Sequence, residues 1–235
     1  MESLKYKERY NRNFNTFSPE EQTRLGASSV LIIGLGGLGG GVCEMLARVG
    51  IGRLILVDGD VFEVSNLNRQ VLSEERLIGV PKAEAARDRV NAINSSIRVT
   101  HRIEFLDEQN LYEQIKGSDV VMDCLDSIDI RFKLQDAAKK ASVPIVSGAI
   151  AGVTGQVTTI FPEDKGYSLI YGEKSRQQMK GVEIKTGNIA YCALLTAALQ
   201  SSECVKIILN RGDLLRNKLL IAELWTNVFE VMDLV

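Results

Sequence analysis

The chain has 235 residues, of which 45% are hydrophobic and 25% charged, and its formal net charge is −2. These values are ordinary for a folded globular protein, so they exclude an intrinsically disordered chain and a fibrous one. A general nucleic-acid binder usually carries a strong basic excess, which this composition lacks. We expect one α/β domain over residues 1–235.

The first residues, MESLKYKERYNRNF, carry neither an apolar signal core nor an Arg- and Ser-rich transit pattern. No later apolar run is expected to reach the length that crosses a bilayer. The sequence therefore predicts a cytoplasmic protein with no membrane partner.

A short helix is the first element that the sequence predicts. Residues 18–21, SPEE, form a capping box with proline at the first helical position, so a helix should run from there toward Gly26. Residues 1–17 precede it as an N-terminal arm. We treat residues 1–26 together as arm and helix.

Strands and helices then alternate. Residues 28–60 contain an apolar strand, a glycine turn, an amphipathic helix and a second apolar strand. Further helices are predicted at 82–94, 106–117 and 128–141, and further strands at 97–105, 118–124 and 143–149. This alternation predicts a Rossmann-like, doubly wound, mostly parallel sheet, which makes residues 27–148 the nucleotide-binding part.

The regular alternation of strands and helices ends after Gly148. A strand at 155–163 follows the previous one too closely for a helical crossover, so it should pair antiparallel. Residues 163–187 have little periodicity and predict a long, mobile crossover loop. A helix at about 188–210 and a closing hairpin then complete an antiparallel extension over residues 149–235.

A glycine-rich loop connects the first predicted strand to its helix. Gly34, Gly36 and Gly39 satisfy G-x-G-x-x-G, with Gly37 between them, and such a turn lets phosphate approach the backbone N–H groups. Asp58 ends the next strand, where a carboxylate accepts hydrogen bonds from a ribose. These features alone fit a nicotinamide or flavin cofactor as well as another adenine nucleotide.

The stretch after Asp58 favours a triphosphate. Arg69 and Lys82 supply cations that neutralise phosphate charge, and Asn66 and Gln70 supply neutral hydrogen bonds. A hydride-transfer site has no need of these cations. Lys82 also opens a predicted helix, where the dipole disfavours a cation, so a ligand explains its place better than helix stability does. A solvated surface lysine is the alternative.

Asp126 follows the strand that ends in Asp123 and Cys124. It lies at the carboxyl edge of the parallel sheet, where α/β proteins place their sites. Magnesium usually takes one or two protein carboxylates together with phosphate oxygens and water, so Asp126 is our candidate Mg²⁺ ligand. The alternative is that Asp126 only caps the helix beginning near Ser127.

Taken in order, the glycine loop, SNLNRQ, G-x-P-K and DCLDS resemble the ThiF/MoeB/HesA family of ubiquitin-activating-like adenylyltransferases. RYNR at residues 9–12 and GQVT near residue 155 extend the resemblance over nearly the whole chain. The resemblance implies a homodimer that binds ATP and Mg²⁺. It also implies that AMP is joined to the Gly-Gly carboxyl terminus of a small ubiquitin-like sulfur-carrier protein and that pyrophosphate is released.

The resemblance also assigns residues. It implies catalytic roles for Arg12, which would reach into the other subunit's site, and for Arg69, Lys82 and Asp126, with no covalent enzyme nucleophile. The residues expected to bind the cofactor are Gly34, Gly36, Gly37, Gly39, Asp58, Asp60, Asn66, Arg69, Gln70 and Lys82.

The cysteines depart from the family pattern. Many members hold zinc through two C-x-x-C pairs, whereas Cys43, Cys124, Cys192 and Cys204 are far apart, so no zinc is expected. Residues 163–187 contain no cysteine, which puts a covalent carrier–enzyme step in doubt.

Three other functions stay open at this point. One is activation of a nucleoside carboxylate in the manner of tRNA threonylcarbamoyladenosine dehydratases, although the acidic composition disfavours nucleic acid. The second is an NAD-dependent oxidoreductase, supported by the glycine loop and Asp58. The third is a noncatalytic binding protein on the same fold.

Overall fold

The computed structural model describes residues 8–173 and 186–235. Eight strands form one sheet in the order β3-β2-β1-β4-β5-β6-β7-β8. Their bounds are β1 Ser29–Ile33, β2 Arg53–Val57, β3 Arg98–Arg102, β4 Val120–Asp123, β5 Ile145–Ala151, β6 Thr154–Ile160, β7 Lys218–Glu223 and β8 Val228–Asp233.

The sheet changes direction where the sequence predicts it. The five strands from β3 to β5 pair parallel, and β6, β7 and β8 are added antiparallel. Only two residues, Gly152 and Val153, separate β5 from β6, so no crossover fits between them. The predicted Rossmann-like sheet with its antiparallel extension is confirmed.

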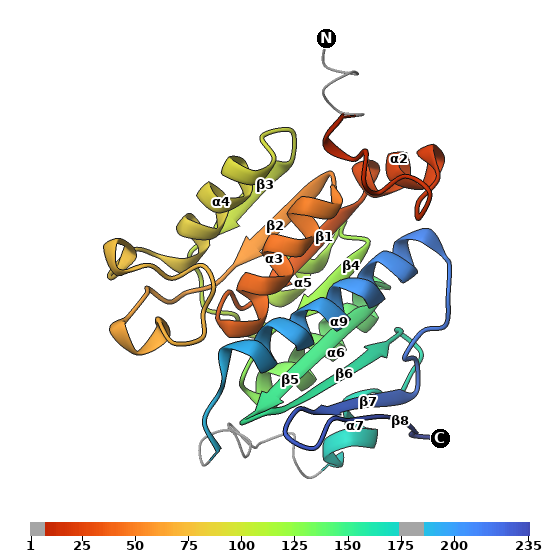
Figure 1. The fold of residues 1–235 in the computed structure, drawn as a ribbon. Coiled ribbons are helices and arrows are strands. Elements are labelled where there is room, and N and C mark those ends of the chain that lie inside the picture. Colours follow the sequence, from red (N-terminus) through yellow and green to blue (C-terminus); the bar gives the residue numbers. More distant parts are fainter. Residues whose placement is uncertain (1–7, 174–185) are drawn as a thin grey trace.

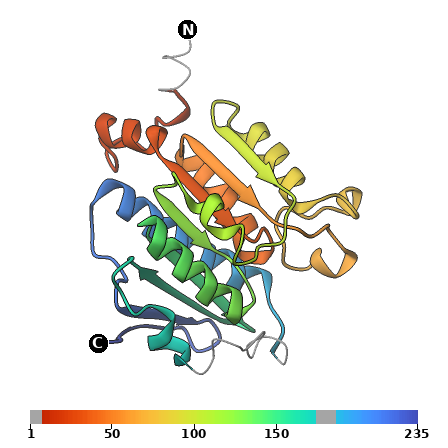
Figure 2. The ribbon, with the colours of Figure 1, turned by 180° about the vertical axis from the view of Figure 1, so that it is seen from behind.

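Helices cover both faces of the sheet (Figures 1 and 2). α3, α4 and α9 lie on the face shown in Figure 1, and α5 and α6 lie on the opposite face shown in Figure 2. The helices are α2 Pro19–Ala27, α3 Gly37–Val49, α4 Lys82–Ile93, α5 Leu111–Ile115, α6 Ile128–Ala141, α7 Tyr167–Tyr171 and α9 Ala190–Leu209, with 3-10 turns at Val64–Asn66 and Glu75–Leu77.

Two separate hydrophobic clusters result, because successive strand side chains point to opposite faces. Val30 and Ile32 of β1 join α3, α4 and α9 in the first cluster. Leu31 and Ile33 of the same strand join α5, α6 and α7 in the second. Strands buried on both faces are mostly apolar, and β1 is buried at all five positions and apolar from Val30 to Ile33.

The expectation that no apolar run reaches the length that crosses a bilayer is wrong for helix α9. In the described ranges it is the one helix long and apolar enough, by length and composition, to cross a bilayer, and half of its apolar window is buried. It packs on α3, β5 and β6, and a Cβ on Gly41 of α3 would lie only 2.8 Å from that of Ala197. Gln200 donates to the Asp123 carbonyl over 2.9 Å. The apolar composition of α9 therefore matches a sheet-covering helix.

The N-terminal arm is anchored at the end of the sheet where the strands begin (Figure 1). Ser18 forms the predicted capping box with Glu21, and α2 ends at Ala27, one residue beyond the predicted Gly26. Tyr10 of the arm is 1% exposed, and its hydroxyl accepts a 2.7 Å hydrogen bond from Asn94. Its ring also fills the space beside Gly50, just before β2.

Several predicted elements are shorter than expected. β3 ends at Arg102, whose partner Val57 is the last residue of β2, so the predicted strand has no neighbour beyond that point. Only Leu111–Ile115 of the predicted helix 106–117 is helical. α7 lies inside the predicted crossover loop, and residues 174–185 of that loop are outside the described residues. The predicted closing hairpin is β7 and β8, and β8 is the exposed edge of the sheet.

Candidate active site

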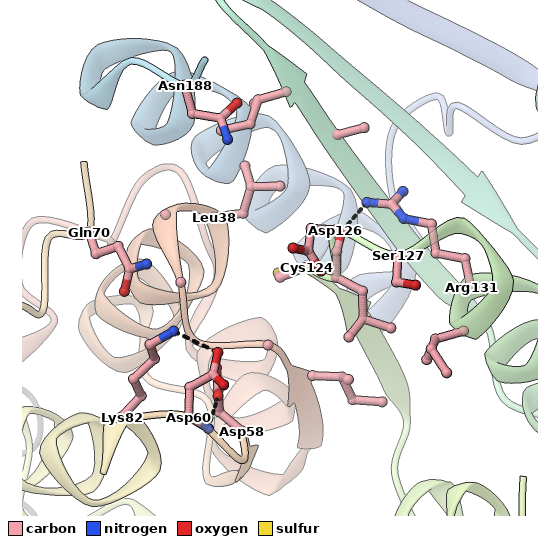
Figure 3. Close-up of a pocket in the computed structure, with 18 of the residues that line it drawn as sticks. Leu38, Asp58, Asp60, Gln70, Lys82, Cys124, Asp126, Ser127, Arg131 and Asn188 are labelled. Atoms are coloured by element: carbon pink, nitrogen blue, oxygen red, sulfur yellow. Dashed lines mark hydrogen bonds and ion pairs between the residues drawn. The ribbon is translucent and has the colours of Figure 1, made fainter. Parts of the chain in front are cut away.

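A pocket of about 900 Å³ lies at the carboxyl ends of the parallel strands, where β1 and β4 are neighbours. The chain leaves β1 and β4 toward opposite helix layers there, and α/β sheets bind ligands at such a switch point. Figure 3 shows Lys82, Asp60 and Gln70 on one side of the pocket and Asp126 and Arg131 on the other. We name the sides the glycine-loop wall (residues 34–39 and 58–82) and the Asp126 wall (residues 123–131).

The glycine loop after β1 is the first part of the glycine-loop wall. Gly34 has a φ of +82°, and a Cβ there would lie 2.8 Å from the Cys124 carbonyl oxygen. Gly36 is the N-cap of α3 and Gly37 its first residue, and the first turn carries no acidic side chain. The free N–H groups and positive end of this helix therefore face the pocket, as an anion site requires.

Asp58 fixes this loop. One carboxylate oxygen accepts from the Leu35 N–H over 2.6 Å, and the other accepts from the Asp60 N–H over 2.8 Å. Burial raises the pKa of the Asp58 carboxyl above its ordinary value. Asp58 thus joins the loop after β1 to the loop after β2 before any ligand binds.

Lys82 is not the solvated surface lysine of the alternative interpretation. Its side chain is 8% exposed, and its Nζ lies 3.0 Å from Oδ2 of Asp60. The chain returns to this point because the Lys82 N–H donates to the Asp60 carbonyl and the Phe62 N–H donates to that of Val80. These two hydrogen bonds close residues 58–82 into a loop, and the buried ammonium group of Lys82 at the end of this loop lines the pocket.

Three further predicted residues line the same wall. Asn66 is 7% exposed, and its side-chain oxygen accepts from the Glu63 N–H over 3.0 Å, so part of its amide already shapes the loop. Gln70 is 6% exposed, and its side-chain oxygen has no hydrogen-bond partner among the residues described. A buried polar atom without a partner suits a site completed by a ligand. Arg69 donates to the Ser65 carbonyl over 2.8 Å and has no carboxylate partner among described residues.

Asp126 lines the opposite wall and is solvent-exposed. Its carboxylate has no hydrogen-bond or ion-pair partner in residues 8–173 and 186–235. Helix α6 begins at Ile128 with Ser127 as its N-cap, and no side chain caps it. The interpretation of Asp126 as a helix cap is therefore wrong.

Two predicted site residues lie away from the pocket wall. Gly39 is absent from the lining, and a Cβ there would lie 1.8 Å from the Gly34 carbonyl oxygen, so this glycine permits close packing of α3 on the loop. Arg12 is exposed on the anchored arm, at the opposite end of the strands from the pocket. All other predicted site residues line the pocket, namely Gly34, Gly36, Gly37, Asp58, Asp60, Asn66, Arg69, Gln70, Lys82 and Asp126.

The structure adds pocket residues that the motifs did not indicate. Arg131 lies in the first turn of α6 and is 3% exposed. Phe105 packs against Gly59, and Asn188 precedes α9 with a side-chain oxygen that has no partner in the described ranges. The β5–β6 hairpin supplies small and polar side chains at Ala149, Ala151, Thr154 and Gln156. A basic residue within the first turn after a sheet-edge Asp is the one signal that could have indicated Arg131.

Cys124 is the cysteine that lines the pocket. Burial, followed by the neighbouring Asp123 charge, raises the pKa of its thiol, so the neutral form is kept at physiological pH. Cys43, Cys192 and Cys204 are free and buried. The thiolate that a covalent step needs is thus disfavoured at Cys124.

Sequence comparisons give a consistent family. The model of the ThiF family matches residues 10–234. The chain is 34% identical over 227 residues to the SAMP-activating enzyme E1 of Haloferax volcanii, covering 96% of this chain and 84% of that protein. It is also 34% identical over 233 residues to the molybdopterin-synthase adenylyltransferase of Escherichia coli, covering 96% and 92%.

Solved structures share the fold. The crystal structure of PaaA superposes with a TM-score of 0.81 at 25% identity, covering 98% of this chain and 74% of that one. Escherichia coli MccB with ATP has a TM-score of 0.83 at 24% identity, covering 96% of this chain and 71% of that one. The fold of this chain therefore also occurs in a protein solved with ATP.

Proposed function

The chain belongs to the ThiF family, and from this premise we propose that it is an ATP-dependent adenylyltransferase for the carboxyl terminus of a small ubiquitin-like sulfur carrier. Two similar proteins over nearly the whole chain are named as a molybdopterin-synthase adenylyltransferase and a SAMP-activating enzyme. The family match gives no support to a dinucleotide oxidoreductase.

The buried cation at Lys82 is the observation that carries the proposal. Together with Arg69 and the amino end of α3, it puts positive charge along the wall that Asp58 begins. A nucleotide whose ribose lies at Asp58 would extend its phosphates along these groups. Such charge favours a triphosphate approached by an anionic nucleophile, whereas a hydride donor gains nothing from it.

Magnesium fits the donor set of the opposite wall. No cluster of three His, Cys, Asp or Glu side chains able to hold a metal occurs in the described ranges. Asp126 supplies one carboxylate that has no partner within residues 8–173 and 186–235, which suits an ion that takes its other ligands from phosphates and water. When bound, Mg²⁺ would neutralise charge on the phosphates and the departing pyrophosphate.

The proposed reaction is a displacement at the α-phosphorus of ATP. One oxygen of the carrier's terminal carboxylate forms a bond to this phosphorus, and the bond from the phosphorus to the β-phosphate oxygen breaks. The products are the acyl adenylate and pyrophosphate. Lys82, Arg69 and the α3 amino end hold the charge, so orientation and electrostatics supply the catalysis.

The β5–β6 hairpin is our candidate entry for the carrier tail. Ala149 and Ala151 have small side chains and line the pocket beyond Asp126, and Thr154, Gln156 and Asn188 add polar groups. A tail ending in two glycines has no side chains to place there. Its backbone N–H and C=O groups would find partners in these amides and hydroxyls.

A homodimer would complete the site. Tyr10 anchors the arm at the amino ends of the strands, so Arg12 of one subunit is remote from its own pocket. We propose that Arg12 enters the pocket of a second subunit and stabilises charge there, as an arginine supplied in trans can do.

Pyrophosphate exchange into ATP tests the activity. Purified protein with Mg²⁺ would be given single candidate carriers ending in Gly-Gly, each matched by the same carrier without its last glycine. Exchange that depends on the intact carrier is expected. If ATP binds but no carrier in the panel supports exchange, the proposed substrate class is wrong, and gel shifts with unfractionated tRNA examine the nucleoside alternative.

Mixing two defective variants tests the arm in trans. Arg12→Ala damages only the arm, and Asp126→Ala damages only the pocket. Mixed dimers contain one pocket with both Asp126 and a donated Arg12, so exchange should return when the variants are combined. A mixture that forms mixed dimers and stays inactive would contradict the role of Arg12.

A further inference from the structure

Arg131 lies in the first turn of α6, within the pocket wall, yet it is almost fully buried. Its Nη1 donates to the Ser147 hydroxyl over 2.9 Å and lies 3.2 Å from Oδ2 of Asp123. Its Nη2 donates to the Leu125 carbonyl and, over 2.7 Å, to that of Gly148. One guanidinium therefore joins the turn after β4 to the neighbouring strand β5.

The carboxylate of Asp123, which pairs with Arg131, also accepts several hydrogen bonds. Asp123 is 0% exposed, and its Oδ2 accepts from the Tyr167 hydroxyl over 2.6 Å and from the Ser147 hydroxyl over 2.7 Å. Its Oδ1 accepts from the Leu125 N–H over 3.1 Å. Burial and then the Asp123 charge raise the pKa of Tyr167, so its phenol keeps the proton that it donates.

Leu125 is consequently held on both sides. Its N–H is bound by Asp123 and its carbonyl by Arg131, and the next residue in the chain is Asp126. Two fixed peptide groups immediately before Asp126 restrict where its Cα can lie. The carboxylate of Asp126 itself stays without a partner among the described residues.

We propose that Arg131 is a positioning residue that acts through Leu125 to hold Asp126 at the place where Mg²⁺ binds. This inference rests on the proposed magnesium role of Asp126. Groups that orient a metal ligand are often as important for metal affinity as the ligand.

The chemistry of arginine is what the position requires. A guanidinium offers five N–H donors in a fixed plane and can serve two carbonyls, a hydroxyl and a carboxylate at once. Lysine would keep the charge beside Asp123, but its single nitrogen cannot reach all four groups. A buried ion pair alone is weak evidence of stabilisation, so the directed bonds to Leu125 and Gly148 carry the argument.

Binding of a nonhydrolysable ATP analogue, measured by calorimetry with and without Mg²⁺, tests the inference. The gain in affinity that Mg²⁺ produces should fall about tenfold in Arg131→Lys, whereas affinity without Mg²⁺ should change little. In an Asp126→Asn background, Arg131→Lys should have no further effect on that gain. Lys133→Met is the matched control, because Lys133 lies on the same helix, does not line the pocket and pairs with Asp129 at 3.6 Å; it should keep the full gain.

The outcomes separate the two proposals. If Asp126→Asn retains the Mg²⁺-dependent gain, the magnesium role fails and this inference fails with it. If Asp126→Asn loses the gain but Arg131→Lys keeps it, only the positioning role is overturned. Should Arg131→Lys not fold, Ser147→Ala removes one bridging hydroxyl and should give a smaller loss of the same kind. Faster amide exchange at residues 124–127 in either variant supports the inference, and unchanged exchange in both contradicts it.

Discussion

The two walls of the pocket use buried charge in different ways. On the glycine-loop wall, Asp58 holds backbone N–H groups, and Lys82 pairs with Asp60, whose carboxylate is largely exposed. On the Asp126 wall, Asp123 and Arg131 pair with each other in the interior, and the exposed Asp126 has no partner in the part of the chain that the structure describes. One wall thus presents a cation to the ligand, and the other presents an anion.

This difference shows how one pocket can prepare for both a nucleotide and a metal ion. A buried lysine is available to phosphate because its competitor Asp60 is also solvated. On the other wall, Arg131 already pairs with Asp123 and donates to two carbonyls, and the Asp126 carboxylate has no partner among the described residues, so it is available to a cation.

Among the substitutions that test this comparison, Asp126→Ala should have the largest effect. The variant should fold normally, since the side chain has no partner among the described residues, but exchange activity should fall about 100-fold or more. Circular dichroism and pyrophosphate exchange would measure the two effects. Glu113→Ala is the control, because Glu113 is an exposed carboxylate on α5 that does not line the pocket. An active Asp126→Ala enzyme would show that the anionic wall is not needed.

Gly39→Ala tests the backbone packing of the glycine-loop wall. The added methyl would lie 1.8 Å from the Gly34 carbonyl oxygen, so a shift of α3 should cost about 1–3 kcal/mol of unfolding free energy. Urea denaturation would measure it. Gly40→Ala is matched on the same helix and meets only the Leu72 and Val71 side chains at 3.2 Å and 3.3 Å, so its cost should be smaller. Equal costs would contradict the close-packing role of Gly39.

Lys82→Met separates charge from packing on the same wall. Methionine keeps most of the buried stem, so stability should change little, whereas ATP affinity should fall about tenfold through loss of a charge-assisted contact. Calorimetry with ATP would measure this. Asp60→Asn keeps a hydrogen-bond acceptor for Lys82 and should not weaken ATP binding. Unchanged ATP affinity in Lys82→Met would remove the main support for a triphosphate.

The smallest expected effect concerns Asp58 and pH. Because burial raises its folded pKa, the folded chain holds this proton up to a higher pH than the unfolded chain does. The free energy of unfolding should therefore fall as pH rises from the unfolded value of about 3.9 through the raised one. Asp58→Asn should show less of this fall when both proteins are unfolded with urea across that range. Parallel pH profiles would contradict the shift.

Much of this arrangement was predictable from sequence because its signals are local. The glycine loop, Asp58 and Lys82 lie within 49 consecutive residues, 34–82, and the parallel order of the strands brings their ends together. The direction change after β5 followed from a two-residue connection. Asp126 followed from its place at the carboxyl edge of the sheet, and the family resemblance added Arg12; both roles stay predictions.

The network around Arg131 was not predictable in the same way. Asp123, Ser147 and Tyr167 come from β4, β5 and α7, and no spacing in the sequence brings them to Arg131. Sheet register and the packing of α7 decide that contact. Apolar α9 was misjudged for a related reason, since its length alone does not reveal that α3 and the sheet cover it.

The separation of the two hydrophobic clusters has a mechanical consequence for the pocket. The glycine loop leads into α3, which is packed in the first cluster, and the Asp126 turn leads into α6, which is packed in the second. The sheet lies between these two helices (Figures 1 and 2). The distance from the glycine loop to Asp126 therefore depends on the packing of both hydrophobic clusters. A core substitution in either cluster would move one side of the pocket relative to the other and so change the distance between the bound phosphates and the metal ligand.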